Sequence, residues 1–437
     1  MSKYETYKPS GIDWIGEVPE HWDRKKIGRC FQTIGSGTTP EAGKSDYYEE
    51  GTINWINTGD LNDGDIIECE KQITQDAFDK HSVLKIYPKG TILIALYGAT
   101  IGKTGFLQIE GATNQACCAL ADSVYIIPRF TFYWTNAVKD YLITQSYGGG
   151  QPNISQDIIR QLRIYLPYKS EQLTIANYLD DQTQKIDRLI ANKKAQAEKL
   201  KELRQIEINN AVTKGLNPDV EMKDSGIDWL GQIPKHWETN RLKNVTNINQ
   251  EVITEKTSPD YELKYIDIGN VTSNGEFLEL QEMTFSEAPS RARRKPKHNS
   301  IILSTVRTYL RAIAFVQNPD DNLIASTGFA VIDAYENLFD AKYLFYQMTS
   351  HIVVDRVIAN SDGVSYPAIS STKLGDMKII LPPKEEQELI SKYLEDRTNA
   401  IDKLIKNIET QIEKLQELRK IKIYEAVTGK IKVNAYE

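Results

Sequence analysis

Apolar residues recur at helical spacing along two long stretches of the chain, residues 166–213 and 381–428. Both stretches are rich in Lys, Glu, Gln, Leu and Ala, and the first has no Gly or Pro between Ser170 and Val212, which favours helix. A spacing of about 3.5 residues predicts a seam between paired helices. The expected seam residues are Ile175, Leu179, Ile186, Leu189, Leu200 and Leu203 in the first stretch, and Ile390, Leu394, Ile401, Leu404, Ile408, Leu415 and Leu418 in the second.

Each stretch predicts a helix of about 40 residues, roughly 60 Å long. Because a small domain cannot bury such a helix, we expect the two helices to pair within the chain. The alternatives are that each lies along its own globular domain or pairs with a second chain. Polar residues interrupt the seam at Gln196 and Gln411, and at Lys193 in the first copy only. Such interruptions cost stability but fix register and pairing.

The two helical stretches are copies at an offset of 215 residues, with 27 of 48 positions identical. "SGIDWIGEVPEHW" (10–22) returns as "SGIDWLGQIPKHW" (225–237), and "GGGQPNIS" (148–155) aligns with "GVSYPAIS" (363–370). The sequence therefore predicts a duplicated chain. The expected parts are a first globular domain (1–165), a first spacer helix (166–215), a second globular domain (216–380), and a second spacer helix with the C-terminal tail (381–437).

The residues between the repeats hardly match one another. "WINTGDL" (55–61) resembles "YIDIGNV" (265–271), and "GTILIALYGATIG" (90–102) aligns with "NSIILSTVRTYLR" (299–311) at an offset of 209. Both inserts have the pattern of mixed α/β domains. Different inserts on a repeated frame favour two different recognition surfaces, held at a fixed distance and related by an approximate two-fold axis.

Composition describes an ordinary soluble protein of 437 residues with a net charge of −7. No apolar run approaches the ~20 residues that cross a membrane, so we expect no membrane association. The four cysteines lack zinc-type spacing, and so few thiols favour the reducing cytoplasm. His21 and His236, in the short repeats, have no nucleophile or metal-ligand partner spaced with them, which favours a structural role.

"GATIGKTG" (98–105) carries the Gly-Lys-Thr of a phosphate-binding loop, but its spacing is wrong. Such a loop needs four residues between its two glycines, so that successive backbone N–H groups surround the phosphates. The first glycine should lie at position 97, which is Tyr97. The segment is therefore interpreted as the counterpart of "VRTYLR" (306–311) in the second insert.

The second insert holds the clearest electrostatic feature. Residues 291–311 contain seven Lys or Arg and no acidic residue. As a strand, "TVRTYLR" would present Arg307, Tyr309 and Arg311 on one face, and two guanidinium groups beside an aromatic ring suit phosphate or guanine. The alternative is a solvated strand edge guarded by charge. The further candidate contacts in this cluster are Arg291, Arg293, Arg294 and Lys295.

The first insert has no arginine at the aligned positions, and its glycines permit a tight turn or a close approach of backbone to a ligand. Asn114 and Gln115 carry amides that suit adenine, although buried structural amides are an equal alternative. The candidate DNA contacts outside the basic cluster are Tyr97, Thr100, Lys103, Asn114, Gln115, Gln151 and Asn153, with Tyr366 in the second copy.

This organisation resembles the specificity subunit of a Type I restriction–modification system. The resemblance covers essentially the whole chain. It rests on the "DWIGEVPEHW" openings, the "INTGDL" and "IDIGNV" segments, "GATIGK" with "TNQA", "VRTYLR" with "STGF", and the two "LPxxxEQ…ID(R/K)LI…EKLxELR" helices. Each motif alone is weak, but together they are specific.

The resemblance implies two α/β target-recognition domains in inverted orientation, joined by conserved helices that form an antiparallel intramolecular coiled coil. Each domain would read one half of a bipartite sequence in double-stranded DNA, and the coiled coil would set the unread gap. The helices would dock two methyltransferase subunits, which restriction subunits can join. The chain would be non-catalytic and bind no cofactor, with S-adenosylmethionine and ATP with magnesium on the partner subunits.

Three alternatives remain open from the residues. A coiled-coil adaptor would use the inserts to bind proteins and would not retain DNA. A nucleotide-dependent enzyme would use "GATIGKTG" and bind ATP or GTP. A closer alternative attaches the same fold to a fused nuclease–methyltransferase partner. The sequence shows no Asn-Pro-Pro-Tyr or Asp-Pro-Pro-Tyr motif of adenine methylation and no metal-ligand cluster, which favours a binding subunit.

Overall fold

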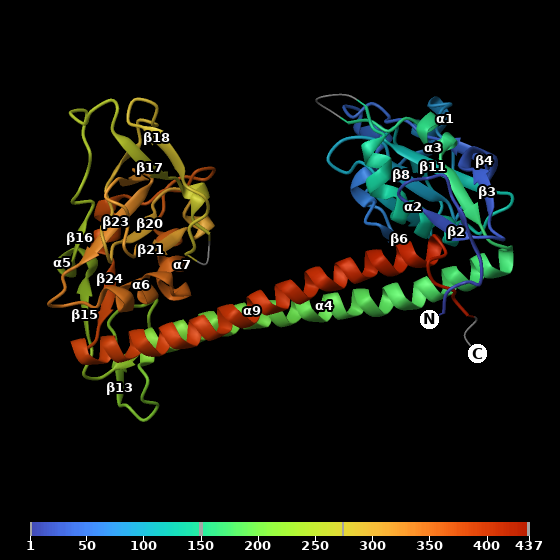
Figure 1. Ribbon diagram of the computed structural model, residues 1–437. Coiled ribbons are helices and arrows are strands. Elements are labelled where there is room, and N and C mark those ends of the chain that lie inside the picture. Colours follow the sequence, from blue (N-terminus) through green and yellow to red (C-terminus); the bar gives the residue numbers. More distant parts are fainter. Residues whose placement is uncertain (1, 148–151, 273–274, 435–437) are drawn as a thin grey trace. The chain divides into compact units, whose positions relative to one another are not determined.

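The computed structural model describes residues 2–147, 152–272 and 275–434 (Figure 1). The chain forms two compact units. Unit 1 comprises Met1–Lys193 and Thr410–Glu437, and unit 2 comprises Lys194–Glu409. Each unit is a mixed α/β domain that includes part of both long helices, α4 (Lys169–Lys214) and α9 (Lys384–Val427). The mixed α/β class and the two long helices expected from the sequence are confirmed.

Unit 1 is built around a five-stranded sheet in the order β4-β11-β8-β9-β6. A three-stranded sheet, β10-β5-β7, and the pairs β1-β2 and β12-β3 complete it. The strands are β1 (Tyr7–Pro9), β2 (Glu17–Pro19), β3 (Asp23–Lys26), β4 (Phe31–Gly35), β5 (Ile53–Ile56), β6 (Gly64–Ile66), β7 (Gln72–Ile73), β8 (Ile92–Ala95), β9 (Thr104–Leu107), β10 (Ala112–Thr113), β11 (Cys117–Ser123) and β12 (Arg163–Leu166). The helices are α1 (Gln75–Lys80), α2 (Pro128–Thr144) and α3 (Gln156–Gln161), with 3-10 turns η1 (Ile27–Arg29), η2 (Ser45–Tyr47) and η3 (Thr58–Asp60).

Unit 2 repeats this plan with the sheet β16-β23-β20-β21 and a second sheet, β18-β17-β22-β19. The pairs β13-β14 and β15-β24 match β1-β2 and β3-β12. The strands are β13 (Met222–Asp224), β14 (Gln232–Pro234), β15 (Glu238–Arg241), β16 (Thr246–Ile248), β17 (Glu262–Ile266), β18 (Gln281–Thr284), β19 (Ala292–Arg294), β20 (Ile301–Ser304), β21 (Ile313–Phe315), β22 (Leu323–Ser326), β23 (Phe329–Ala334) and β24 (Lys378–Leu381). The helices are α5 (Leu242–Val245), α6 (Ala341–Thr349), α7 (His351–Ala359) and α8 (Ser371–Asp376), with η4 (Ile268–Asn270) and η5 (Thr308–Leu310).

The globular core of each unit is completed by the two long helices. In unit 1, Ile175 and Leu179 of α4 and Ile423 and Val427 of α9 belong to the main hydrophobic cluster. The cluster of unit 2 contains the residues 215 positions away from all four, which are Ile390, Leu394, Ile208 and Val212. Burying each of these side chains contributes on the order of 2 kcal/mol, which holds the helix ends against their domains.

The two helices run antiparallel within each unit. In unit 1, Arg419 Nε of α9 donates to Asp187 Oδ1 of α4 at 2.9 Å. The same pair recurs in unit 2, where Arg204 Nε donates to Asp402 Oδ1 at 2.9 Å. Glu207 also binds Arg397, at 3.1 Å. The helix pairing expected from the sequence is therefore made within the chain.

The buried seam departs from the expected heptad positions. Ile186 and Ile401 are buried and Leu200 and Leu415 half-buried, whereas Leu189, Leu203, Leu404 and Leu418 are exposed. Ala197 and Ile405 are buried instead. A helix with 3.6 residues per turn drifts relative to a strict 3.5-residue repeat, which carries these leucines away from the partner helix. None of the described helices is long and apolar enough to span a bilayer.

Candidate nucleic-acid interface

The basic segment of unit 2 does not form the strand expected over residues 305–311. β20 ends at Ser304 and pairs with antiparallel β21, so the intervening residues must reverse the chain. Ser304 N donates to Ala312 O at 2.9 Å and closes the loop. Arg307 and Arg311 flank η5 in the left-handed region, at φ of 51° and 54°. The expectation of a shared strand face is wrong, because this segment is a hairpin loop.

The corresponding loop of unit 1 has the same shape. Gly98 and Gly102 adopt φ of 80° and 74°, at the positions that Arg307 and Arg311 occupy when the offset of 209 is applied. Ala95 N donates to Lys103 O at 2.8 Å, which matches the closure of the unit 2 loop. The alignment of "YGATIG" (97–102) with "VRTYLR" (306–311) is confirmed. The segment connects antiparallel strands β8 and β9, whereas a phosphate-binding loop opens a helix, so the nucleotide hypothesis is not supported.

A second loop lies against the first in each unit. In unit 1, Ile154 N donates to Leu96 O, and in unit 2 Ile369 N donates to Thr305 O, both at 2.8 Å. This contact places Asn153 beside Tyr97 through an isolated bridge. Gln151, the other candidate of this segment, lies outside the described residues.

In unit 2 the second loop brings an aromatic ring onto the basic loop. Arg307 N donates to Pro367 O at 2.8 Å, and its guanidinium lies 4.9 Å from the ring centroid of Tyr366. Tyr309 and Tyr366 are 52% and 67% exposed. Arg307 forms no ion pair with a described residue, whereas Arg311 binds Asp355 at 2.9 Å. The two loops therefore present to a ligand two exposed rings and a guanidinium that has no carboxylate partner among the described residues.

A 3-10 turn stands at the end of a central strand in each unit. Asn57 and Asp60 form a capping box around η3, and Asp267 and Asn270 do the same around η4. The shape shared by the two copies explains why "WINTGDL" and "YIDIGNV" align. The sequence-based expectations did not include the capping role of these residues. Polar residues three positions apart are the sequence pattern that could have indicated a capping box.

The side-chain amide of Asn114 makes hydrogen bonds within the protein. Its Nδ2 donates to Asn57 Oδ1 at 3.1 Å, and its Oδ1 accepts from Ala116 N at 3.1 Å. Gln115 is exposed, and its Oε1 accepts from the Thr39 hydroxyl at 2.6 Å. Thr100 and Lys103 are half-buried in the first loop. Of these candidates, Gln115 has the exposure that a base contact needs.

Backbone contacts connect Arg291 to the basic loop. Its Nη2 binds Asp267 Oδ2 at 2.6 Å, at the cap of η4. Thr327 N donates to Arg291 O at 2.7 Å, and Thr305 N donates to Gly328 O at 2.8 Å. The chain of contacts therefore runs from Arg291 through residues 326–328 to the basic loop.

The other cations of this segment have contacts of their own. Arg293 binds Glu255 at 2.6 Å and lies over the Phe285 ring at 4.9 Å. Arg294 is half-buried, its Nε has no hydrogen-bond partner among the described residues, and burial lowers its pKa. Lys295 is half-buried, and its backbone N donates to Glu251 O at 3.0 Å. The contacts of Arg293 and the burial of Arg294 indicate a structural role alongside any contact with a ligand.

The short repeats fasten each unit to its long helix. His21 Nε2 lies 2.8 Å from a carboxylate oxygen of Glu171, and His236 Nε2 lies 2.6 Å from one of Glu386. Trp22 Nε1 donates to the same carboxylate of Glu171, at 3.3 Å. These contacts agree with the structural role expected for the two histidines.

Among the described residues, no group of three or more His, Cys, Asp or Glu is placed to hold a metal ion. All four cysteines are free, and burial raises the pKa of the Cys118 thiol to about 12. The pKa of the Cys117 thiol is also raised, by burial first. Thiols held neutral in this way are poor nucleophiles at neutral pH.

Together these elements define a class: a duplicated α/β scaffold on two antiparallel helices, in which each copy displays loops of different chemistry. The model of the Type I restriction modification DNA specificity domain matches residues 19–199 and again 234–414. The chain belongs to this family, with two copies of the domain.

Curated relatives agree along the full length. The Type I restriction enzyme MjaIX specificity subunit of Methanocaldococcus jannaschii is 26% identical over 96% of this chain and 95% of that protein. The MjaVIII specificity subunit of the same organism is also 26% identical, over 95% of this chain and 94% of its own. The chain is thus similar to Type I specificity subunits from end to end.

The fold has a counterpart among solved structures. A chain from a study of complex assembly and conformational transition of the type I R-M system superposes with a TM-score of 0.69. The match covers 95% of this chain and 99% of that chain at 14% identity. At this identity the likeness concerns the fold, and it supports the duplicated α/β architecture.

Proposed function

We propose that the chain reads a bipartite DNA sequence, with one half-site bound by each unit. The observation that carries this proposal is that both units present the same pair of loops with different side chains. In unit 1 the first loop offers Gly98, Gly102 and Lys103, and in unit 2 it offers Arg307 and Arg311. Because base edges differ in their donors and acceptors, unlike side chains on one frame read unlike half-sites.

The chemistry of unit 2 suits a half-site that contains guanine. Arg307 has no carboxylate partner among the described residues, so its guanidinium is available for bidentate contact with guanine O6 and N7. Arg311 and Arg291 are engaged by Asp355 and Asp267, and exposed ion pairs of this kind are weak enough to exchange for phosphate.

In this proposal the chain itself performs no catalysis. Two methyltransferase subunits dock on the repeated frame and bring S-adenosylmethionine, and restriction subunits bring ATP and magnesium. The complex acts in the cytoplasm on chromosomal DNA. The names of the relatives, all specificity subunits, support this division of labour.

Long-read methylation mapping tests the proposal. The host genome is compared with and without this gene, in a strain that expresses the partner methyltransferase. Loss of one bipartite methylated motif on deletion is the expected result, and it reveals both half-sites together. An unchanged set of methylated motifs in that strain would contradict the proposal and favour a protein-binding adaptor.

A further inference from the structure

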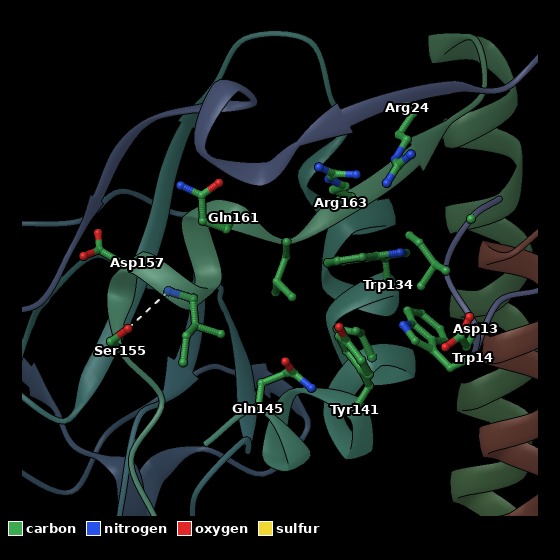
Figure 2. A pocket seen from close by; sticks show the side chains of 15 residues that line it. Asp13, Trp14, Arg24, Trp134, Tyr141, Gln145, Ser155, Asp157, Gln161 and Arg163 are labelled. Carbon is green, nitrogen blue, oxygen red and sulfur yellow. Dashed lines mark hydrogen bonds between the residues drawn. The ribbon is translucent and has the colours of Figure 1, made fainter. Parts of the chain in front are cut away.

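Unit 1 has a pocket between its repeated frame and α2, and the lining of this pocket reaches Ser155, directly after the second loop. It has a volume of about 580 Å³, and Figure 2 shows Trp14, Trp134 and Tyr141 lining it beneath Arg24 and Arg163. Trp14 and Tyr141 are stacked, with ring centroids 5.8 Å apart. The pocket thus combines an aromatic lining with a cationic rim.

A second recess adjoins this pocket and shares its two arginines. It has a volume of about 510 Å³ and is lined by Arg24, Lys25, Lys26, Arg29, Tyr125 and Arg163. Within the described part of the chain, none of its five cations forms an ion pair. Lys25 Nζ lies over the exposed Tyr125 ring at 5.2 Å, and Lys26 Nζ donates to Gln161 Oε1.

The neighbouring carboxylates do not neutralise this surface. Asp13 and Asp157 lie on the lining of the aromatic pocket, and the adjoining recess has no acidic residue. Five cations therefore face two carboxylates, in a chain whose net charge is −7. We call the two recesses together the basic–aromatic surface.

The cationic recess of this surface lies at the far end of the central sheet from Gln115, whereas the aromatic pocket reaches Ser155, next to the second loop of unit 1. Strand β11 begins at Cys117, just after Gln115, and ends at Ser123, just before Tyr125. At about 3.3 Å per residue the seven-residue strand separates the two ends by roughly 20 Å. The cations themselves lie on β3, η1 and the paired strand β12, which leads into α4.

Unit 2 keeps only part of the cationic surface, because Arg241 and Lys378 stand at the positions of Lys26 and Arg163. At the offset of 215, Arg24 and Lys25 correspond to Thr239 and Asn240. Asp376 stands in the position of Gln161, where it binds Arg241 at 3.1 Å and Lys243 at 2.6 Å. Asp376 therefore partly neutralises the corresponding edge of unit 2.

The aromatic part differs too. Tyr133 of α2 contacts the hydroxyl of Thr183, and Tyr346 of α6 contacts that of Thr398. These matching contacts give an offset of 213 residues between α2 and α6. At that offset, Trp134 and Tyr141 correspond to Gln347 and Val354. Two copies that agree in fold thus differ at one surface of the repeated frame.

The composition of the basic–aromatic surface indicates a protein partner. Trp, Tyr and Arg are the residues that dominate protein–protein binding energy. DNA phosphates require cations but no aromatic pocket, and the cationic recess lies at the opposite end of β11 from Gln115. An acidic segment with one apolar anchoring side chain fits both recesses.

We propose that the basic–aromatic surface docks an acidic segment of the methyltransferase subunit that binds unit 1, and that unit 1 therefore binds methyltransferase more tightly than unit 2. This inference rests on the proposed function, in which the repeated frame carries one methyltransferase at each unit. Because the extra contact exists in one copy, the complex fills in two steps, and unit 1 fills first.

Native mass spectrometry of the full chain, titrated with the methyltransferase of its own system, tests this proposal. The variant R24E/K25E/R163E reverses three exposed or half-buried cations. The matched control T239E/N240E/K378E places glutamate at the equivalent positions of unit 2, where Lys378 is the one cation that is replaced. We expect the first variant to weaken the tighter binding step about tenfold or more and to reduce its salt dependence, and the control to leave that step unchanged.

Several results would overturn the inference. Two equal steps in the unaltered protein, no effect of R24E/K25E/R163E, or an equal effect of the control would each do so. Weaker DNA binding with unchanged methyltransferase affinity would assign the surface to DNA phosphates instead. Melting temperature checks that both variants fold, and the milder K25A/R29A variant repeats the test.

Failure of this inference is distinct from failure of the proposed function. If the chain does not read DNA, deletion of the gene leaves the methylated motifs unchanged. If only the docking inference fails, the bipartite motif is still lost on deletion and the two methyltransferase steps are unaffected by the charge reversal.

Discussion

Left-handed backbone at two positions gives the reading loops their shape. Glycine adopts this conformation at little cost, and Gly98 and Gly102 do so in unit 1. In unit 2 the same positions hold Arg307 and Arg311, where a residue with a side chain costs on the order of 1 kcal/mol. A strain that unit 1 avoids and unit 2 accepts is consistent with two guanidinium groups that serve recognition.

Arg307→Gly removes the guanidinium and leaves the loop conformation accessible. Since the backbone of Arg307 is already left-handed and Gly98 has the same role in unit 1, we expect unfolding free energy to change little. Affinity for DNA should fall by about 1–3 kcal/mol and discrimination in one half-site should relax, if Arg307 contacts a base. Competition between DNA duplexes with single substitutions in either half-site measures both effects.

The competition experiment shows which part of the DNA Arg307 contacts. Equal weakening on all duplexes would place the guanidinium on phosphate, and unchanged binding would remove Arg307 from the interface. Thermal unfolding of the same variant shows that neither outcome comes from a damaged domain.

Gly37→Ala should disturb the other reading surface by steric overlap. A Cβ at Gly37 would lie 1.8 Å from Thr113 O, a backbone atom directly before Asn114. We expect a loss of about 1–3 kcal/mol of unfolding free energy and impaired reading of the unit 1 half-site. Urea unfolding and methylation mapping measure these effects.

Gly43→Ala is the matched control, because a Cβ there meets no atom within 4 Å. It should leave stability and methylation close to those of the unaltered protein. Equal behaviour of the two variants would show that the approach of residue 37 to Thr113 is not required.

At the scale of the elements, each long helix has two kinds of neighbour. Its ends complete the globular cores, and its remaining residues pair with the other helix. A seam of strict heptads would serve only the second purpose. The exposed leucines Leu189 and Leu404, which are equivalent at the offset of 215, are left for another contact.

Leu189→Gln and Leu404→Gln should weaken methyltransferase docking with little effect on the chain itself. Both side chains are about half exposed, at 49% and 52%, so their replacement should change unfolding free energy by no more than ~0.5 kcal/mol. Ile186→Gln is the contrasting variant, because Ile186 is buried and should cost about 2 kcal/mol or more. Calorimetry and pull-down of the partner methyltransferase give the two readouts.

If Leu189→Gln and Leu404→Gln bind methyltransferase as well as the unaltered chain, these leucines lie outside the docking surface. If both variants lose stability as Ile186→Gln does, the leucines pack within the seam after all.

At the scale of the whole molecule, the structure shows where an insert begins and ends. Ile27 N donates to Leu162 O at 2.9 Å, so the frame closes at these two residues. An exchange over residues 30–145 would leave out the loop that holds Asn153, which contacts Tyr97. Exchange of residues 30–161 with a relative's insert keeps all reading loops of unit 1 together.

That exchange should change one half of the methylated motif and preserve the other half and the gap. The reason is that unit 2, α4 and α9 retain their sequence. Methylation mapping of a strain carrying the exchanged gene measures the result. A change in both halves would contradict the assignment of one half-site to each unit.

The sequence by itself determined the duplication, the long paired helices and the correspondence between the two reading loops. These features are local or periodic, so propensity, apolar spacing and the offset between copies reveal them. The positions of Gly98 and Arg307 could be aligned from sequence because the strands before them share an apolar pattern.

Only the tertiary structure decided which of these residues meet. Residues 305–311 have the pattern of a strand, but the pairing of β20 with β21 makes them a loop. In sequence, Arg293 and Arg311 cannot be distinguished from Arg307. In the structure, Arg293 binds Glu255 and Arg311 binds Asp355, and both carboxylates are distant along the chain. Charge pairing and burial depend on contacts between remote segments, and a linear pattern carries no record of them.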